Sequence, residues 1–373
     1  MKFLISLTLF TISQLSANID IDYPSLLKDS EKVEVLWSGY QSGELEALGF
    51  YSAISEINLN NLEVRDQLRI AQIKNSFKGE KSSFSIYKLN EAQAMKIASE
   101  LDEFTKVSMR LGEDVAKSIE KAQAQLSDLA KFQPKSKQQI EDIVFNTPDV
   151  ADYKNGQYHN GVKLFLFCRH DRSYPCRFVL KDMHDRLVRN SYGELWSLPA
   201  LAKSAGNLPF YKTNGYTPEG VHTIDSVMPE ANRVLSFGKF RRVILNWVPT
   251  DADTRKLLPR SNHSSKWWRA ASIARNNGRK WLRIHGTGRI NKRPSSKYYP
   301  HMPTAGCVSV REGSYPGVTY KDQRVILDSL MKAMGLGPVF MNEPKIKGLL
   351  YVIELDQKEE RVSVETLKEY GIF

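Results

Sequence analysis

The chain reads Met302-Pro303-Thr304-Ala305-Gly306-Cys307-Val308-Ser309-Val310-Arg311 in one stretch. A thiol is a useful nucleophile only as thiolate, and a free cysteine with a pKa near about 8.5 is only about 3% ionised at pH 7. A histidine is the usual helper, and the upstream stretch Arg283-Ile284-His285-Gly286-Thr287 supplies one. Gly306 has no side chain just before the sulfur, so backbone N–H groups around Cys307 can approach a developing oxyanion. The pattern therefore favours Cys307 as nucleophile and His285 as its base.

His-Gly-Thr followed by Thr-x-Gly-Cys-Val resembles the signature of the L,D-transpeptidase catalytic domain, the YkuD family. Upstream, Thr217-Pro218-Glu219-Gly220 with Ile224 resembles the Thr-Pro-x-Gly-x-x-x-Ile strand entry of that family. The resemblance covers roughly Gly161 to Asp356. Eighteen residues lie between His285 and Thr304, slightly more than the family commonly shows. Ala305 replaces a common second histidine, and Ser309 stands where the family usually has Asn or Arg.

The resemblance implies a cysteine acyltransferase that acts on peptidoglycan stem peptides and releases D-Ala, with no cofactor. His285 would act as base and then as acid, and the carbonyl of Gly286 would orient its imidazole. An amine acceptor gives a crosslink, and water gives L,D-carboxypeptidase activity. We expect the substrate contacts to come from Thr304, Gly306, Ser309, Arg311 and His301.

Two other classes of function stay open. A zinc hydrolase would use His285, His301 and Cys307, although their spacing matches no zinc signature. The other is a non-catalytic cell-wall-binding protein, in which the cleft around Cys307 would be present but Cys307 would not act as a nucleophile. A papain-like protease is disfavoured, because in that class the cysteine precedes the histidine.

The composition indicates a soluble globular protein with a basic surface. The 53 lysines and arginines against 42 aspartates and glutamates leave a formal net charge of +11. Such a surplus favours anionic partners, and carboxylate-rich stem peptides fit it. No nucleic-acid-binding motif is present, so nucleic acid is not an expected partner.

The N-terminal residues resemble an export signal. Met1-Lys2 is followed by an apolar run from Phe3 to Ile12 and a small-residue exit at Ala17. This run is too short to span a membrane, and a signal peptide over residues 1–17 predicts location in the periplasm or secretion to a bacterial cell envelope, with no membrane span after cleavage. A buried first helix or a retained anchor is the alternative.

Three cysteines are an odd number for an exported chain. Cys168 ends one strand-like run and Cys176 begins the next, so the two can face each other across a hairpin and form a disulfide. They can equally be reduced packing residues. The pairing would leave Cys307 free.

Hydrophobic periodicity divides the chain into two regions and predicts an α+β fold. Residues 18–146 read as helical, with Ala92, Met95 and Ala98 on one stripe and Ile119, Ala122 and Leu126 on another. We take residues 147–160 as a linker and 161–373 as a mainly β domain. The expected strands are 162–168, 176–181, 221–225, 242–247, 281–285 and 349–355, with helices at 328–334 and 364–370. The helical region either binds the wall or a protein partner, or simply packs on the β domain.

Overall fold

The computed structural model describes residues 28–42, 45–55, 57–58, 62, 66, 69–70, 73, 91–100, 113–150, 153–315 and 317–373. The chain forms two compact units that divide between Ala122 and Gln123. The expected signal peptide and the linker residues 151–152 lie outside the described residues. No helix among the described residues is both long and apolar enough to span a membrane.

The first unit is helical, as predicted. Its helices are α2 (Asp29–Ser42), α3 (Ala47–Ser55), α5 (Glu91–Glu100) and the first half of α7 (Glu113–Ala130). Val33 and Leu36 of α2 pack with Phe50 and Ala53 of α3 in a small core of their own. Ile119, Ala122 and Leu126 of α7 are buried on one stripe, which agrees with the predicted periodicity.

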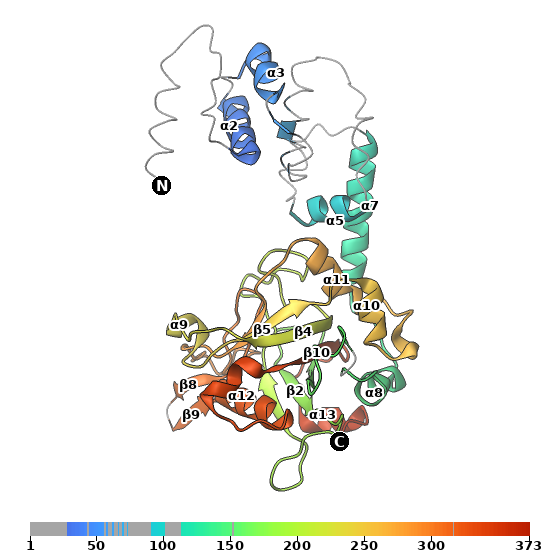
Figure 1. The fold of residues 1–373 in the computed structure, drawn as a ribbon, viewed down its shortest axis with the longest axis vertical. Helices are drawn as coiled ribbons and strands as arrows, with labels where there is room; N and C mark the ends of the chain where they lie inside the picture. The colour runs from blue at the N-terminus through green and yellow to red at the C-terminus, as the bar shows by residue number, and fades with distance from the viewer. Residues whose placement is uncertain are drawn as a thin grey trace. The chain divides into compact units, whose positions relative to one another are not determined.

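The second unit is built on one eight-stranded mixed sheet with the strand order β3-β2-β1-β10-β4-β5-β6-β7. Figure 1 labels β2, β10, β4 and β5 of this sheet. The strands are β1 (Val162–Cys168), β2 (Cys176–Lys181), β3 (Ser197–Ala200), β4 (Gly220–Val227), β5 (Val243–Trp247), β6 (Arg283–His285), β7 (Val308–Ser309) and β10 (Lys347–Glu354). Leu201, directly after β3, forms an isolated bridge with Ser309 of β7. The two edge strands therefore meet, and the sheet is nearly closed.

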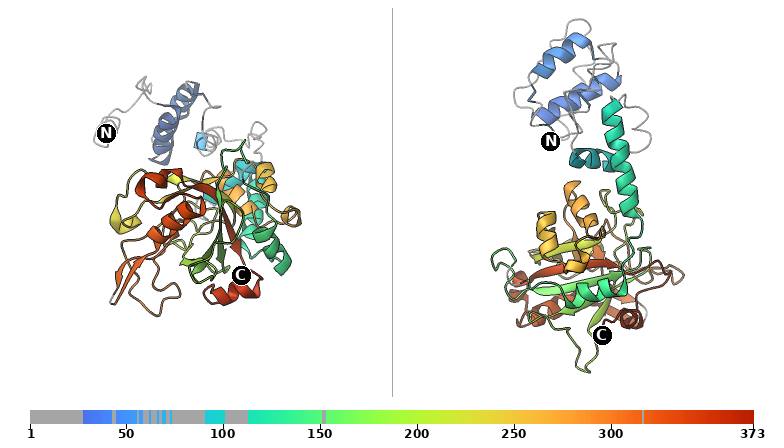
Figure 2. Two further views of the ribbon diagram at one scale, coloured as in Figure 1. Left: turned by 60° about the horizontal axis from the view of Figure 1, so that its bottom comes forward. Right: turned by 90° about the vertical axis from the view of Figure 1, so that its right-hand side faces the viewer.

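Apolar residues cover both faces of this sheet. Along β1, Leu164 and Leu166 belong to one core, whereas Phe165 and Phe167 belong to the other. Helix α12 (Asp322–Ala333) buries Ile326 and Leu330 in the first core. Helices α8 (Lys137–Phe145) and α13 (Val364–Glu369) cover the other face (Figure 2). Strands buried on both faces explain the continuous apolar runs in the sequence.

Shorter elements complete the unit. They are α9 (Val234–Phe237), α10 (Asp251–Lys256), α11 (Arg269–Asn276), the 3₁₀ turns η2 (Arg260–Asn262) and η3 (Phe340–Lys345), and a separate hairpin of β8 (Glu312–Tyr315) and β9 (Val318–Lys321). The predicted α+β class is confirmed.

The second unit begins earlier than the sequence suggested. Helix α8 starts at a capping box in which Ser136 and Gln139 exchange side-chain hydrogen bonds of 3.1 and 2.9 Å. Its Ile140 and Ile143 are fully buried against the β region. The expected linker also packs, because Tyr158 is buried in the same core. The sequence pattern places α8 in the helical region, because the packing partner of a helix cannot be read from the helix's own periodicity.

A disulfide closes the β1–β2 hairpin. Cys168 and Cys176 are bonded, with their Cα atoms 4.3 Å apart, and both are fully buried. Cys307 is the remaining, free cysteine.

Candidate active site

Strand pairing brings the two key stretches together. Strands β6 and β7 are parallel neighbours, with Ile284 opposite Val308 and His285 opposite Ser309. Ile284 and Val308 point into the core beneath α12. Cys307 directly precedes β7 and His285 ends β6, so the parallel pairing brings these two residues onto neighbouring segments of the sheet. The structure thus places the predicted nucleophile and base on adjacent segments that are 22 positions apart in the sequence.

The Cys307 thiol lies in a narrow, largely buried position with 9% of the residue exposed. Its Sγ donates to the carbonyl oxygen of Trp281 at 3.7 Å. Trp281 itself has a left-handed backbone, with φ of 62°, and its side chain points out, so that the residue is 78% exposed. A non-glycine residue in this region is strained, and such strain is common around functional groups.

The imidazole of His285 is oriented by its neighbour. Its Nδ1 lies 2.5 Å from the carbonyl oxygen of Gly286, which is the contact that the resemblance implied. A carbonyl oxygen only accepts, so Nδ1 carries the hydrogen and Nε2 presents a lone pair. Nε2 is buried and has no hydrogen-bond partner. The ring of Phe237 packs edge-on against the imidazole, with centroids 5.0 Å apart.

The thiol and the imidazole are not hydrogen-bonded to each other in this structure, because Sγ donates to Trp281 and Nε2 is unpartnered. Burial raises the pKa of the Cys307 thiol, although the Arg283 backbone N–H and nearby guanidinium groups oppose this shift. Burial, together with the charge of Arg242, lowers the pKa of His285 to about 4. At neutral pH the pair is therefore a thiol and a neutral imidazole. This state suits general-base activation better than a preformed thiolate–imidazolium ion pair.

Three arginines near the thiol escaped the sequence analysis. Arg283, Arg279 and Arg242 each lower the pKa of Cys307 by their charge. Only Arg283 carried a signal, since it precedes His285 by two positions on a strand and so shares its face. Arg279 is held by the backbone: its Nη2 donates to the carbonyl of Gly215 at 2.7 Å and its Nη1 to that of Tyr216 at 3.0 Å.

The turn before Cys307 is tightly built. Gly306 has φ of 98°, and a Cβ there would collide with the Gly215 carbonyl oxygen, so glycine is required for two reasons. The Thr217 hydroxyl donates to the carbonyl of Gly306 at 2.8 Å, which links the Thr-Pro stretch to this turn. The Thr304 hydroxyl donates to the carbonyl of Cys307 at 2.7 Å.

Two of the other predicted substrate contacts, Ser309 and Arg311, are engaged within the protein, and the third, His301, is buried. The Ser309 hydroxyl is fully buried and donates to the carbonyl of Met302 at 2.6 Å. Arg311 pairs with Asp322 at 2.6 Å. His301 is 3% exposed with an unpartnered Nδ1, and burial lowers its pKa to about 3. In this state Ser309 and Arg311 support the loop around the thiol.

The sequence analysis also missed a buried carboxylate that lies against Gly286, the residue after His285. Glu312, at the start of β8, lies against Gly286 and Gly238, where a Cβ on either glycine would overlap it. One carboxylate oxygen accepts from the backbone N–H of Lys239, whereas Oε2 is buried without a partner. Burial raises the pKa of this carboxyl. Glu312 reaches Gly286 only through the fold, so its position in the sequence gave no signal.

Among the residues that the structure describes, no group of three or more histidine, cysteine, aspartate or glutamate side chains is arranged to hold a metal ion. The set proposed for a zinc hydrolase is thus not gathered around one point. Comparison with models of known protein families, with curated proteins and with solved structures gave no match to this chain.

Proposed function

We propose that the second unit is a cysteine acyltransferase of the L,D-transpeptidase type, acting on peptidoglycan stem peptides. The observation that carries the proposal is the parallel pairing of β6 with β7, which sets the only cysteine outside a disulfide beside a histidine with a free, unprotonated Nε2. The order of the motifs supports the same reading. The disulfide suits an oxidising compartment, so we propose the bacterial cell envelope or its exterior as the location.

In the proposed reaction, His285 Nε2 takes the proton from Cys307 Sγ as the sulfur attacks the carbonyl of the residue preceding a terminal D-alanine. The C–N bond breaks, the leaving D-alanine amine takes the proton from His285, and a thioester remains on Cys307. An acceptor amine then gives its proton to His285 and displaces the sulfur, which recovers its hydrogen. Water in place of the amine gives carboxypeptidase activity at the same residues.

The proposal requires the thiol to turn from the Trp281 carbonyl toward His285 when substrate binds. Catalytic hydrogen bonds are often incomplete without substrate. The guanidinium groups of Arg242, Arg279 and Arg283 favour the thiolate formed in this step and would also attract the stem carboxylates.

The test is incubation of the full chain with tetrapeptide muropeptides, followed by mass measurement of the products. Crosslinked dimers indicate transfer, and tripeptides alone indicate hydrolysis. We expect Cys307→Ala to abolish both, and His285→Gln to lower the rate by about 10²–10⁴-fold. His222→Phe is the matched control, because His222 is also a buried histidine of the sheet but binds the carbonyl of Pro218. Activity retained by Cys307→Ala would overturn the assignment.

A non-catalytic wall-binding protein is the second candidate, and the buried thiol favours it. In that case peptidoglycan sacculi would retain the chain in a pull-down, Cys307→Ala would bind equally well, and no muropeptide would change mass.

A further inference from the structure

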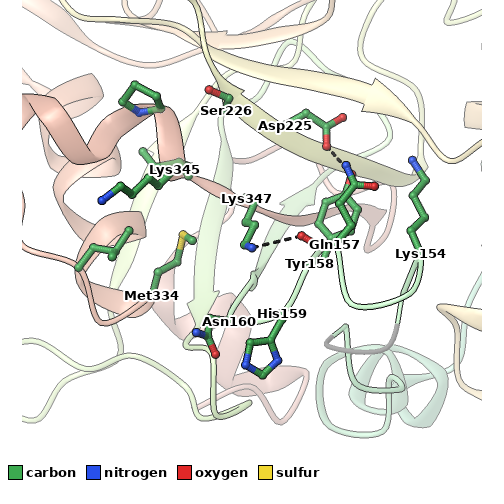
Figure 3. Close-up of a pocket in the computed structure, with 13 residues that line it drawn as sticks. Lys154, Gln157, Tyr158, His159, Asn160, Asp225, Ser226, Met334, Lys345 and Lys347 are labelled. Carbon is green, nitrogen blue, oxygen red and sulfur yellow. Dashed lines mark hydrogen bonds between the residues drawn. The ribbon is translucent and has the colours of Figure 1, made fainter.

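A cleft elsewhere in the same unit shares no residue with the candidate active site. It has a volume of about 590 Å³ and opens to solvent. Three segments line it: the turn region before β1, the end of β4, and the connection between α12 and β10 (Figure 3). In the sheet, β4 is three strands from β7, about 14 Å at ordinary strand spacing. The volume is in the range of small-molecule sites.

The cleft is lined by more lysines than carboxylates. Lys154 comes from the turn region before β1, whereas Lys345 and Lys347 both come from the connection between α12 and β10; His159 also lines the cleft. Lys347 Nζ donates to the carbonyl of Gln157 at 3.2 Å and Lys345 Nζ to Asn342 Oδ1 at 3.0 Å, whereas Lys154 lies over the ring of Tyr158. None of these three lysines forms an ion pair within the described part of the chain. By contrast, the buried Lys163 and Lys181 both pair with Asp185.

Asp225 is the one acidic residue that lines the cleft, and its oxygens are already engaged. It accepts from the Tyr158 hydroxyl, from Thr223 Oγ1 at 2.6 Å and from Asn246 Nδ2 at 2.8 Å. The carboxylate thereby ties the turn before β1 to the sheet. Three lysines against this single aspartate leave a surplus of two positive charges.

The backbone of the cleft is held in unusual conformations. Ser226 has φ of 80° at an irregularity in the pairing of β4 with β5, and its N–H donates to the carbonyl of Ile346 at 2.7 Å. Lys154 and Asn160 also have left-handed backbones, with φ of 49° and 61°. A left-handed backbone is unfavourable for serine and lysine, and bulges and strained residues cluster at binding sites.

We propose that this cleft binds a small ligand with two or more negatively charged oxygen-bearing groups, phosphate or carboxylate. The three ammonium groups supply the charge, one from the turn region before β1 and two from the connection between α12 and β10. Gln157 and Asn160 add amide groups for a polar ligand body. The site is independent of the proposed acyl transfer.

The experiment is isothermal titration of the full chain at low salt with two probes, inorganic pyrophosphate and citrate. We expect saturable binding of at least one, and the tighter probe identifies the preferred anion. The double variant Lys345→Gln/Lys347→Gln should weaken that binding by at least about tenfold, since it removes two of the three ammonium groups that line the cleft. Lys154→Gln, an exposed position, gives an independent single-site test.

The matched control is Lys256→Gln/Lys368→Gln, which removes the same charge from exposed positions outside the cleft. We expect this variant to bind as the unchanged protein does. Equal weakening by both double variants would show only general charge attraction and would overturn the proposal. So would the absence of saturable binding of either probe at about 5 mM, where a millimolar site would be more than half filled.

Discussion

The candidate active site depends on two side chains whose pKa values burial moves in opposite directions. The Cys307 pKa is raised and the His285 pKa is lowered to about 4, so both groups are neutral at pH 7. An ion-paired cysteine protease site has the reverse arrangement, with the thiol pKa strongly lowered. The chemistry of this site should therefore depend on proton transfer during the reaction.

The thiol's reactivity toward iodoacetamide tests this directly. We expect the alkylation rate of Cys307 in the free protein to rise with a midpoint above that of a free cysteine, because burial favours the uncharged thiol. Mass measurement after quenching at a series of pH values gives the profile, and the same series on the urea-unfolded protein is the reference. A midpoint near pH 5 would contradict a resting thiol and indicate an ion pair with His285.

At the scale of elements, two buried lysines connect helix α8 to the sheet. Lys163 and Lys181 lie opposite each other on β1 and β2. Lys163 Nζ donates to the carbonyl of Thr147 at 3.1 Å, and Lys181 Nζ donates to the carbonyl of Val144 at 2.9 Å. Both lysines therefore bind backbone carbonyls at or just beyond the C-terminal turn of α8. Asp185 contacts both ammonium groups at 2.8 Å. One carboxylate therefore compensates two buried charges.

Asp185→Asn should destabilise the protein by about 2 kcal/mol, because it removes the carboxylate that forms ion pairs with two buried ammonium groups. Asparagine keeps the shape and tolerates the left-handed backbone at this position, where φ is 60°. Urea unfolding measures the change. Asp182→Asn is the control in the same turn, since Asp182 pairs with Arg186, whose side chain is 72% exposed, and we expect a loss of at most about 1 kcal/mol. Equal losses would refute the role of Asp185.

On the scale of the whole molecule, three buried histidines couple folding to pH. Burial lowers the pKa of His222 and of His285 to about 4 and that of His301 to about 3. Below about pH 6.5 the unfolded chain binds protons at these residues and the folded protein does not. Stability is therefore full above this pH and is lost as the pH falls toward 4. Glu219, whose pKa burial raises to about 7, works in the opposite direction.

We predict that the free energy of unfolding falls between pH 6.5 and 4.5, by about 1.4 kcal/mol per pH unit for each histidine and partly offset by Glu219. His222→Phe should reduce the dependence of the unfolding free energy on pH by the contribution of one histidine, about 1.4 kcal/mol per pH unit. This holds even if the substitution changes the stability at pH 7. Urea unfolding of both proteins at pH 7, 6 and 5 compares the slopes. If the unfolding free energies of the two proteins changed in parallel with pH, His222 would have the same pKa in the folded and unfolded states, and the prediction would be wrong.

Local sequence patterns were sufficient to predict the helices and strands that bury a continuous apolar run. The bounds predicted for β1 and β2 match the structure, and the helix predicted at 328–334 is the second half of α12. Strand β3 and the hairpin β8–β9 escaped, because β3 is four residues with a proline and β9 is mostly exposed. Helices α10 and α11 are short, six and eight residues, and the sequence analysis assigned nothing there.

The sequence by itself determined the class of fold, the candidate nucleophile and its candidate base, because residue type and two- or 3.6-residue periodicity are local properties. Only the tertiary structure decided that β6 lies parallel to β7, that Glu312 lies against Gly286 and that Lys154 shares a cleft with Lys345 and Lys347. These depend on contacts between residues far apart in the chain, which periodicity does not encode. Burial, which decides the pKa values of Cys307 and His285, is likewise a property of the packed molecule alone.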